Sequence, residues 1–260
     1  MHILGLQLDL IWHDPKGNRD KVEAHLGNYQ GPLDLLLLPE MFTTGFSMEA
    51  EDNAEPANGP TVQWMHELAQ KRDCLIGGSL ITEDAGTFFN RFYLVGPNGW
   101  QAHYDKRHTF RMAGEHENYD SGKERVVVEY NGWKILLLVC YDLRFPVWSR
   151  NRNTDDGLEY DLILLVANWP TPRVEQWEIL VKARAIENQC YIAAINRVGE
   201  DGKGIPYSGR SMIVDPRGEA LVAARHQETS ILAELSQDRL NYYRERFPFW
   251  MDADEFEMKD

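Results

Sequence analysis

Three reactive side chains each follow directly on a run of apolar or aromatic residues. Glu40 closes the segment L-L-L-L-P-E, Lys106 lies within H-Y-D-K-R-H, and Cys140 ends L-L-V-C. Open α/β sheets carry their reacting groups at the carboxyl ends of strands, so neighbouring strands would bring these groups into one pocket. A thiol attacks carbonyl carbon, a carboxylate carries protons, and an ammonium stabilises an oxyanion. The spacing therefore predicts acyl transfer that requires no metal ion and no cofactor.

Cys140 stands where a predicted strand reaches the surface. Residues 135–139 are an apolar run of the length expected for a strand buried on both faces, and the charged Asp142 and Arg144 follow closely. We expect backbone N–H groups of the next turn to lower the pKa of the thiol and to bind an oxyanion. The competing interpretation is a small core residue, a common role of free cysteine.

The charged residues near the predicted site have structural interpretations of their own. Glu40 could cap a helix or lie on the surface, and Lys106 could belong to a solvated charged turn. Arg144 follows Cys140 by one helical turn, so both could face the pocket; alternatively, Arg144 pairs with Asp142 or caps a helix. Glu40, Lys106 and Cys140 together favour the catalytic interpretation, because three independent coincidences are improbable.

Aromatic and small polar residues near the predicted strand ends are candidates for the pocket wall. Trp169 and Thr171 follow a predicted strand at 161–166, although aromatic packing explains Trp169 equally well. Phe46 is expected to cover the apolar part of a short substrate. The histidines lack a matched set of carboxylates or cysteines at ligand spacing, so no metal site is predicted.

The elements that must position these residues alternate between strands and helices. Strands are predicted at 2–8, 33–38, 74–81, 88–95, 99–104, 125–130, 133–139, 161–166, 190–196, 211–214 and 229–235, and helices at 18–29, 60–71 and 173–188. Hairpins interrupt the βαβ units, which favours a layered α/β fold without a purely parallel sheet. No linker is visible, so residues 1–260 are predicted to form one domain, with about 236–260 as an aromatic, acidic tail.

The composition limits the partners. Against 41 Asp and Glu stand 27 Lys and Arg, a net charge of −14, which argues against nucleic acid and anionic membranes because both require clustered positive charge. Three cysteines without a C-x-x-C pair disfavour a disulfide framework or a zinc site. The first ten residues read as a strand rather than a signal peptide, and no apolar run reaches membrane-spanning length. We therefore expect a cytoplasmic protein that acts on a small molecule.

Three segments carry a family resemblance. P-E-M-F-T-T-G-F, Y-D-K-R-H-T-F-R-M-A-G-E-H and V-C-Y-D-L-R-F-P resemble the nitrilase superfamily of carbon–nitrogen hydrolases, which uses a Glu–Lys–Cys triad in this chain order. The resemblance extends over nearly the whole chain. It implies a four-layer αββα sandwich, with two mixed sheets flanked by helices. It also implies a homodimer in which helices of the two subunits pack together.

The resemblance assigns roles to the candidate residues. It implies that Glu40 is the general base, Lys106 the oxyanion-stabilising group and Cys140 the nucleophile, while the backbone N–H of Tyr141 completes the oxyanion hole.

Two further roles also rest on the resemblance. A second glutamate after the lysine orients the lysine or the substrate amine; Glu115 is our choice, and Glu117 stays open. Arg144 occupies the position that grips the carboxylate in relatives acting on carboxylate-bearing amides, a bidentate role that suits arginine.

Within the superfamily, the chain is similar to the bacterial omega-amidase branch. That similarity implies hydrolysis of the terminal amide of 2-oxo-acid amides such as 2-oxoglutaramate, through a cysteine thioester, to the dicarboxylate and ammonia. Amidase action on deaminated glutathione or on an N-carbamoyl amino acid stays an alternative, because these substrates share the amide and the carboxylate. An alternative of another class is a catalytically silent dimeric binding protein.

Overall fold

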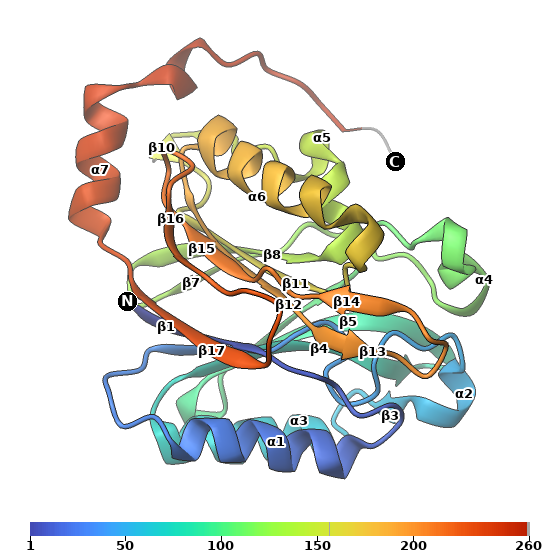
Figure 1. Cartoon of the computed structure of the whole chain (residues 1–260). Coiled ribbons are helices and arrows are strands. Elements are labelled where there is room, and N and C mark those ends of the chain that lie inside the picture. The colour runs from blue at the N-terminus through green and yellow to red at the C-terminus, as the bar shows by residue number, and fades with distance from the viewer. Residues whose placement is uncertain (156, 259–260) are drawn as a thin grey trace.

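Two β-sheets lie face to face between two layers of helices in the computed structural model, which describes residues 1–155 and 157–258. In Figure 1, α1 (Pro15–Gly27) and α3 (Pro60–Arg72) lie below the sheets, and α6 (Val174–Asn188) lies above them. This is the predicted four-layer αββα sandwich, and the fold class is confirmed.

The first sheet is mixed. It contains, in spatial order, β17 (Thr229–Glu234), β1 (His2–Gln7), β2 (Leu35–Leu37), β4 (Leu75–Asp84), β5 (Thr87–Val95) and β6 (Gln101–Asp105), and β3 (Glu55–Pro56) pairs with β4. Strands β1, β2 and β4 run parallel, whereas β17, β5 and β6 are antiparallel to their neighbours. The parallel strands therefore share one carboxyl edge.

The second sheet is also mixed. Its order is β16 (Ala220–Ala223), β15 (Met212–Val214), β12 (Tyr191–Asn196), β11 (Leu162–Ala167), β8 (Trp133–Val139) and β7 (Val127–Tyr130). Strands β8, β11 and β12 run parallel, and β7, β15 and β16 pair antiparallel. The small ribbons are β9 (Asn153–Thr154) with β10 (Gly157–Leu158), and β13 (Val198–Glu200) with β14 (Pro206–Ser208).

Short helices connect these elements. The α-helices are α2 (Ala50–Asn53), α4 (Glu115–Asn118), α5 (Pro146–Ser149) and α7 (Gln237–Arg246), and the 3₁₀ turns are η1 (Pro97–Gly99), η2 (Arg111–Ala113), η3 (Cys140–Arg144), η4 (Thr171–Arg173) and η5 (Phe249–Asp252). Among the residues described, every helix is too short or too polar to cross a membrane.

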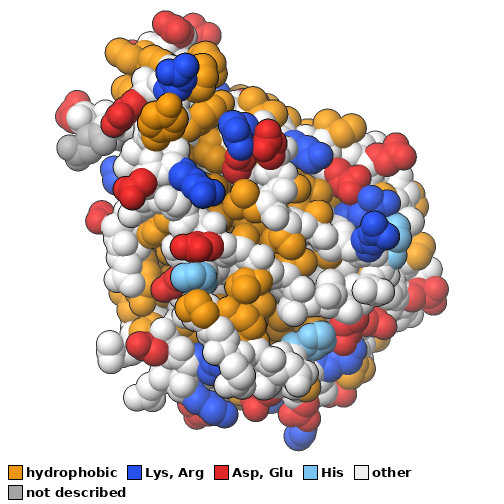
Figure 2. Space-filling view, turned by 60° about the vertical axis from the view of Figure 1, so that its left-hand side comes forward, with side chains coloured by type: hydrophobic (Ala, Val, Ile, Leu, Met, Phe, Trp, Pro, Cys, Tyr) orange, Lys and Arg blue, Asp and Glu red, His pale blue; other side chains and the backbone are white. Residues whose placement is uncertain are grey.

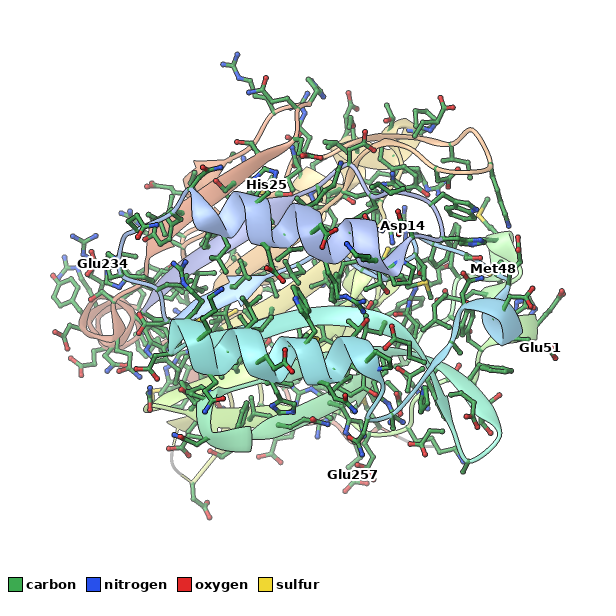
Figure 3. The ribbon with its side chains drawn as sticks, turned by 90° about the horizontal axis from the view of Figure 1, so that it is seen from below. Asp14, His25, Met48, Glu51, Glu234 and Glu257 are labelled. Carbon is green, nitrogen blue, oxygen red and sulfur yellow. The ribbon has the colours of Figure 1, made fainter. Side chains whose placement is uncertain are left out.

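The leucine run of β2 is buried on both faces because its side chains alternate between two cores. Leu35 and Leu37 belong to the apolar cluster between the sheets, which also contains Leu137 of β8. Leu36 belongs instead to the cluster that includes Val22 of α1 and residues of α3. Seen from below in Figure 3, these two helices lie side by side across the sheet. The sandwich thus holds β2 rigidly at the centre of the first sheet.

Several predicted boundaries were wrong by a few residues. The helix predicted at 18–29 spans Pro15–Gly27, because Asp14 caps it by accepting a hydrogen bond from the backbone N–H of Gly17. The strand predicted at 33–38 is only three residues long. Within the predicted tail lies α7, which the sequence analysis missed and which runs along one side of the molecule in Figure 1. Its N-cap is Ser236, whose hydroxyl accepts from the backbone N–H of Arg239.

Acidic and basic side chains are mixed on one face of the molecule. Figure 2, which brings the left-hand side of Figure 1 forward, shows acidic and basic side chains intermingled with exposed hydrophobic ones. Large exposed apolar side chains in the last part of the chain include Tyr242, Phe249 and Met251.

Candidate active site

The reactive side chains predicted from the sequence lie together at one end of the sandwich. Glu40 follows β2, Lys106 follows β6 directly, and Cys140 follows β8 of the opposite sheet. The Nζ atom of Lys106 lies 2.8 Å from Oε1 of Glu40, and these two side chains are 1% and 0% exposed. Such burial contradicts the alternatives in which Glu40 lies on the surface or Lys106 belongs to a solvated turn.

A second buried carboxylate completes the surroundings of the lysine. Nζ of Lys106 donates to both oxygens of Glu115, each at 2.9 Å, and Glu115 is itself fully buried at the start of α4. The backbone N–H of Phe110 also donates to Glu115. Glu117 points to solvent, with a side chain 74% exposed. The geometry therefore places Glu115, and not Glu117, beside Lys106.

Two asparagines that the sequence analysis did not single out fix the orientation of Glu40. Nδ2 of Asn90 donates to Oε1 of Glu40 at 2.8 Å and to Glu115 at 3.1 Å. The backbone N–H of Asn168 donates to Oε2 of Glu40 at 2.7 Å, and its Nδ2 donates to the main-chain oxygen of Glu40. Asn168 directly follows β11, so its position at a strand end was a usable signal. Asn90 lies within β5 and gave none.

The buried charges stabilise one another. Burial alone would lower the pKa of Lys106, but the negative charges of Glu115 and Glu40 outweigh burial and hold that pKa above its ordinary value. Burial raises the pKa of Glu115, Lys106 opposes the rise, and the nearby Glu40 adds to it. Lys106 is therefore a permanent cation at neutral pH.

Cys140 occupies a sharp turn between β8 and η3. Val139 is extended, whereas Cys140 has φ +45°, in the left-handed region that non-glycine residues rarely occupy. Burial raises the pKa of its thiol well above the ordinary value, Glu40 adds to the rise, and Lys106 opposes it. The expectation that the turn lowers this pKa is wrong, because burial and the charge of Glu40 outweigh the opposing charge of Lys106. The site thus places a thiol of raised pKa beside the Glu40 carboxylate.

Asp142 ties the cysteine turn to the segment that follows Lys106. One of its oxygens accepts from the backbone N–H of Val139 at 3.0 Å and from the hydroxyl of Tyr104 at 2.8 Å. The other accepts from the backbone N–H of His108 at 3.1 Å and lies 2.7 Å from its Nδ1. These four contacts replace the ion pair with Arg144 that the sequence left open. They fix the position of Cys140, which follows a strand of the second sheet, relative to Lys106, which follows a strand of the first.

A small cavity of about 170 Å³ opens onto Cys140. Five of the predicted residues line it, namely Phe46, Cys140, Tyr141, Arg144 and Trp169, and the wall is completed mainly by Phe110, Ala113, Pro170, Pro172, Arg173, Ile205 and Tyr207. Thr171 is not among the lining residues, since the flanking prolines face the cavity in its place, and its role stays a prediction. The wall is therefore largely apolar and aromatic, with two guanidinium groups.

Arg144 lies one turn beyond Cys140, as the spacing predicted. Its guanidinium lies over the ring of Trp169, 4.8 Å from the centroid, and donates to Oε1 of Gln176 at 2.5 Å. In the part of the chain that the structure describes, no carboxylate forms an ion pair with it. The cation is held in place by an aromatic ring and an amide, and its charge stays free for an anion.

The arrangement fits nucleophilic attack on a carbonyl group. The thiol of Cys140 reaches the cavity, the Glu40 carboxylate stands beside it to take the proton, and the Lys106 ammonium supplies fixed positive charge for an oxyanion. Within residues 1–155 and 157–258, no three His, Cys, Asp or Glu side chains are grouped to hold a metal ion. The roles of the individual residues stay predictions.

Comparison with known proteins gives consistent matches along the chain. The family model described as carbon-nitrogen hydrolase matches residues 5–245. The chain is 51% identical over 254 residues to the omega-amidase YafV of Escherichia coli strain K12, covering 97% of this chain and 96% of that protein. It is 32% identical to the 2-oxoglutaramate amidase of Bacillus subtilis strain 168, covering 95% of each.

A solved structure extends the comparison to the fold. XC1258 of Xanthomonas campestris, a CN-hydrolase superfamily protein with an arsenic adduct in its active site, matches with a TM-score of 0.97 at 45% sequence identity. The match covers 100% of this chain and 99% of that one.

Proposed function

Because this chain belongs to the carbon–nitrogen hydrolase family, we propose that it is an omega-amidase. It hydrolyses the terminal amide of 2-oxo-acid amides such as 2-oxoglutaramate to the dicarboxylate and ammonia. The observation that carries the proposal is the buried Glu40–Lys106–Glu115 cluster beside Cys140, beneath a cavity that presents Arg144. The relatives named omega-amidase and 2-oxoglutaramate amidase support this substrate class.

The first half of the reaction forms a thioester. Glu40 accepts the thiol proton as Sγ of Cys140 attacks the amide carbon, and a tetrahedral oxyanion forms. The ammonium of Lys106 carries three N–H donors, of which one is directed to Glu40 and one is shared between the oxygens of Glu115. The third is free to donate to the oxyanion. The backbone N–H of Tyr141 is the second donor to that oxyanion. Protonated Glu40 then gives its proton to the nitrogen, the C–N bond breaks and ammonia leaves.

The second half hydrolyses the thioester. Glu40, again a carboxylate, accepts a proton from a water molecule as the water oxygen attacks the thioester carbon. The second oxyanion meets the same two donors. When the intermediate collapses, the C–S bond breaks and the sulfur of Cys140 regains a proton from Glu40. The new carboxyl group loses its remaining proton to water, and the product leaves as the dicarboxylate. Glu115 keeps Lys106 oriented throughout.

Replacement of the nucleophile tests the proposal. Cys140→Ala should lower kcat for ammonia release from 2-oxoglutaramate by at least about a thousandfold, because no thioester can form. Cys74→Ala is the matched control, since Cys74 is a buried free thiol in the core behind the first sheet. Unchanged turnover in Cys140→Ala, or absence of turnover in the unaltered enzyme, would contradict the proposal.

The alternative substrates differ in what lies on either side of the scissile bond. Deaminated glutathione carries a much larger leaving group than ammonia, and the cavity beside Cys140 is small. A panel of 2-oxoglutaramate, deaminated glutathione and N-carbamoyl amino acids, compared by kcat/KM, decides among them. A higher value for either alternative would replace the substrate proposed here.

We also propose that the enzyme is a cytoplasmic homodimer. Apolar side chains protrude from its helical layer: Ile179 and Ile186, 66% and 50% exposed, stand seven residues apart on one face of α6, and Val147 of α5 is 56% exposed. All three cysteines are free, as a reducing compartment favours. Light scattering should give twice the mass of one chain for the unaltered enzyme. The double variant Ile179→Glu, Ile186→Glu should give the mass of one chain. The control Leu221→Glu, at the sheet edge, should still give the mass of two chains.

A further inference from the structure

A second arginine faces the same cavity as Arg144. Arg173 ends η4, directly before α6, and lines the cavity. Its guanidinium lies over the ring of Phe110, 5.2 Å from the centroid. Among the described residues, no side chain or main-chain oxygen forms a hydrogen bond or an ion pair with that guanidinium. Its positive charge is therefore available to a ligand.

The anchor of Arg144 and the backbone of Arg173 lie close together in the sequence, at the start of α6. Gln176, whose side-chain oxygen holds Arg144, lies three residues after Arg173, and residues three apart are neighbours on a helix surface. Trp169 connects the two as well: Arg144 lies over its ring, and its Nε1 donates to the main-chain oxygen of Arg173 at 2.7 Å. The structure thus presents two cations at one cavity, Arg144 held by Gln176 and Trp169, and Arg173 over the ring of Phe110.

Nothing in the cavity wall offsets this positive charge. No Asp or Glu belongs to the described residues that line the cavity. The carboxylates beneath it, Glu40 and Glu115, are both engaged by Lys106. The end of a substrate that lies beside the arginines therefore meets positive charge and no carboxylate among the described residues of the cavity wall.

This environment distinguishes two kinds of acid. A 2-oxo acid presents only acceptors, namely the two carboxylate oxygens and the oxo oxygen. A 2-amino acid presents a carboxylate beside an ammonium, which has three donors and no acceptor. Next to a guanidinium, that ammonium would meet a like charge, and no carboxylate among the described lining residues would offset it.

We propose that Arg173 is the specificity-determining residue that selects amides of 2-oxo acids over amides of 2-amino acids. Arg144 binds the carboxylate through two N–H donors, and Arg173 donates to the 2-oxo oxygen. This inference rests on the proposed omega-amidase function and predicts in addition that L-glutamine, with the same terminal amide, is a poor substrate.

Three amides test the assignment: 2-oxoglutaramate, L-glutamine and butyramide. Butyramide has neither a carboxylate nor an ammonium group. Arg173→Met should lower kcat/KM for 2-oxoglutaramate by about 10- to 100-fold, mainly through KM, since a charge-assisted hydrogen bond is lost. The same variant should leave butyramide within about twofold, because that amide makes no use of the arginine. Arg173→Glu should raise kcat/KM for L-glutamine above that of the unaltered enzyme, since it supplies a partner for the ammonium.

Arg111→Met is the matched control. Arg111 is exposed in η2, close to the cavity-lining Ala113, and does not itself line the cavity, so its loss changes the net charge equally. Its selectivity should equal that of the unaltered enzyme.

The failures of the two proposals are distinguishable. If the unaltered enzyme does not hydrolyse 2-oxoglutaramate, the omega-amidase function itself fails. If it does, and Arg173→Met keeps both its rate and its preference for the 2-oxo acid, Arg173 is not the determinant. Equal losses of kcat/KM on all three amides would likewise overturn the inference, because they indicate a structural role.

Discussion

Glu40 acts on Cys140 in two opposite ways. Its charge helps to raise the pKa of the thiol, which favours the protonated sulfur. It is also the carboxylate proposed to accept that proton during attack. Since a neutral thiol reacts slowly with electrophiles and oxidants, the raised pKa disfavours side reactions of the proposed nucleophile.

Glu40→Gln separates these two effects. Turnover of 2-oxoglutaramate should fall by about 10²- to 10⁴-fold, because the general base is lost. The pKa of the thiol should fall as well, because the carboxylate that raised it is gone. The pH at which iodoacetamide alkylation of Cys140 accelerates should therefore shift downward, while catalysis declines.

Glu117→Gln provides the comparison, since Glu117 is exposed and lies two residues from Glu115. It should leave turnover and the alkylation profile unchanged. A Glu40→Gln profile that shifts upward in pH, or does not move, would show that Glu40 does not control the thiol.

At the scale of elements, the turn between β8 and η3 orients Cys140, the proposed nucleophile. Cys140 adopts φ +45°, a conformation that costs a residue with a Cβ atom roughly 1 kcal/mol relative to glycine. The turn persists because Asp142 binds the backbone on its near side and the lysine segment across the sandwich. The left-handed turn brings Cys140 to the cavity wall, at the edge of the apolar cluster between the sheets.

The strain can be measured with two inactive variants. Cys140→Gly should unfold at a higher urea concentration than Cys140→Ala, by about 1 kcal/mol in free energy, because glycine adopts positive φ without strain. At Cys190, a buried thiol without positive φ, the order should reverse, with Cys190→Ala the more stable. The same order of stability at both positions would argue against strain at the nucleophile.

At the scale of the whole molecule, α7 in the last part of the chain packs against the second sheet. Leu240 of α7 is 1% exposed within the core between and above the sheets. Arg244 donates to Asp161 at 2.6 Å and to the main-chain oxygens of Tyr160 and Gln189 at 2.8 and 2.9 Å. These contacts hold the amino-terminal ends of β11 and β12, opposite the end that carries the active site.

Arg244→Met should therefore lower the free energy of unfolding by about 2–3 kcal/mol, since a charged hydrogen-bond network is broken. The kcat of the folded enzyme should not change. Arg246→Met, in the same helix and beside Phe247, should cost much less. Urea denaturation followed by fluorescence measures all three proteins, and equal losses in the two variants would contradict a specific role for Arg244.

The sequence by itself determined where the reacting groups stand along the chain. An apolar run ends where the chain leaves the sheet, so Glu40, Lys106 and Cys140 were recognisable as strand-end residues. Arg144 follows Cys140 by one turn, a local relation that spacing alone predicts. Local order also gave most strands and the longer helices to within a few residues.

Tertiary structure decided what depends on distant segments. It chose Glu115 over Glu117, added Asn90 and Asn168 beside Glu40, and brought Arg173 to the cavity. It also reversed the expected direction of the pKa shift at Cys140, because burial and the charge of Glu40 come from the opposite sheet. Pairing across the sandwich leaves no periodic signal in the sequence, so only the folded chain reveals it.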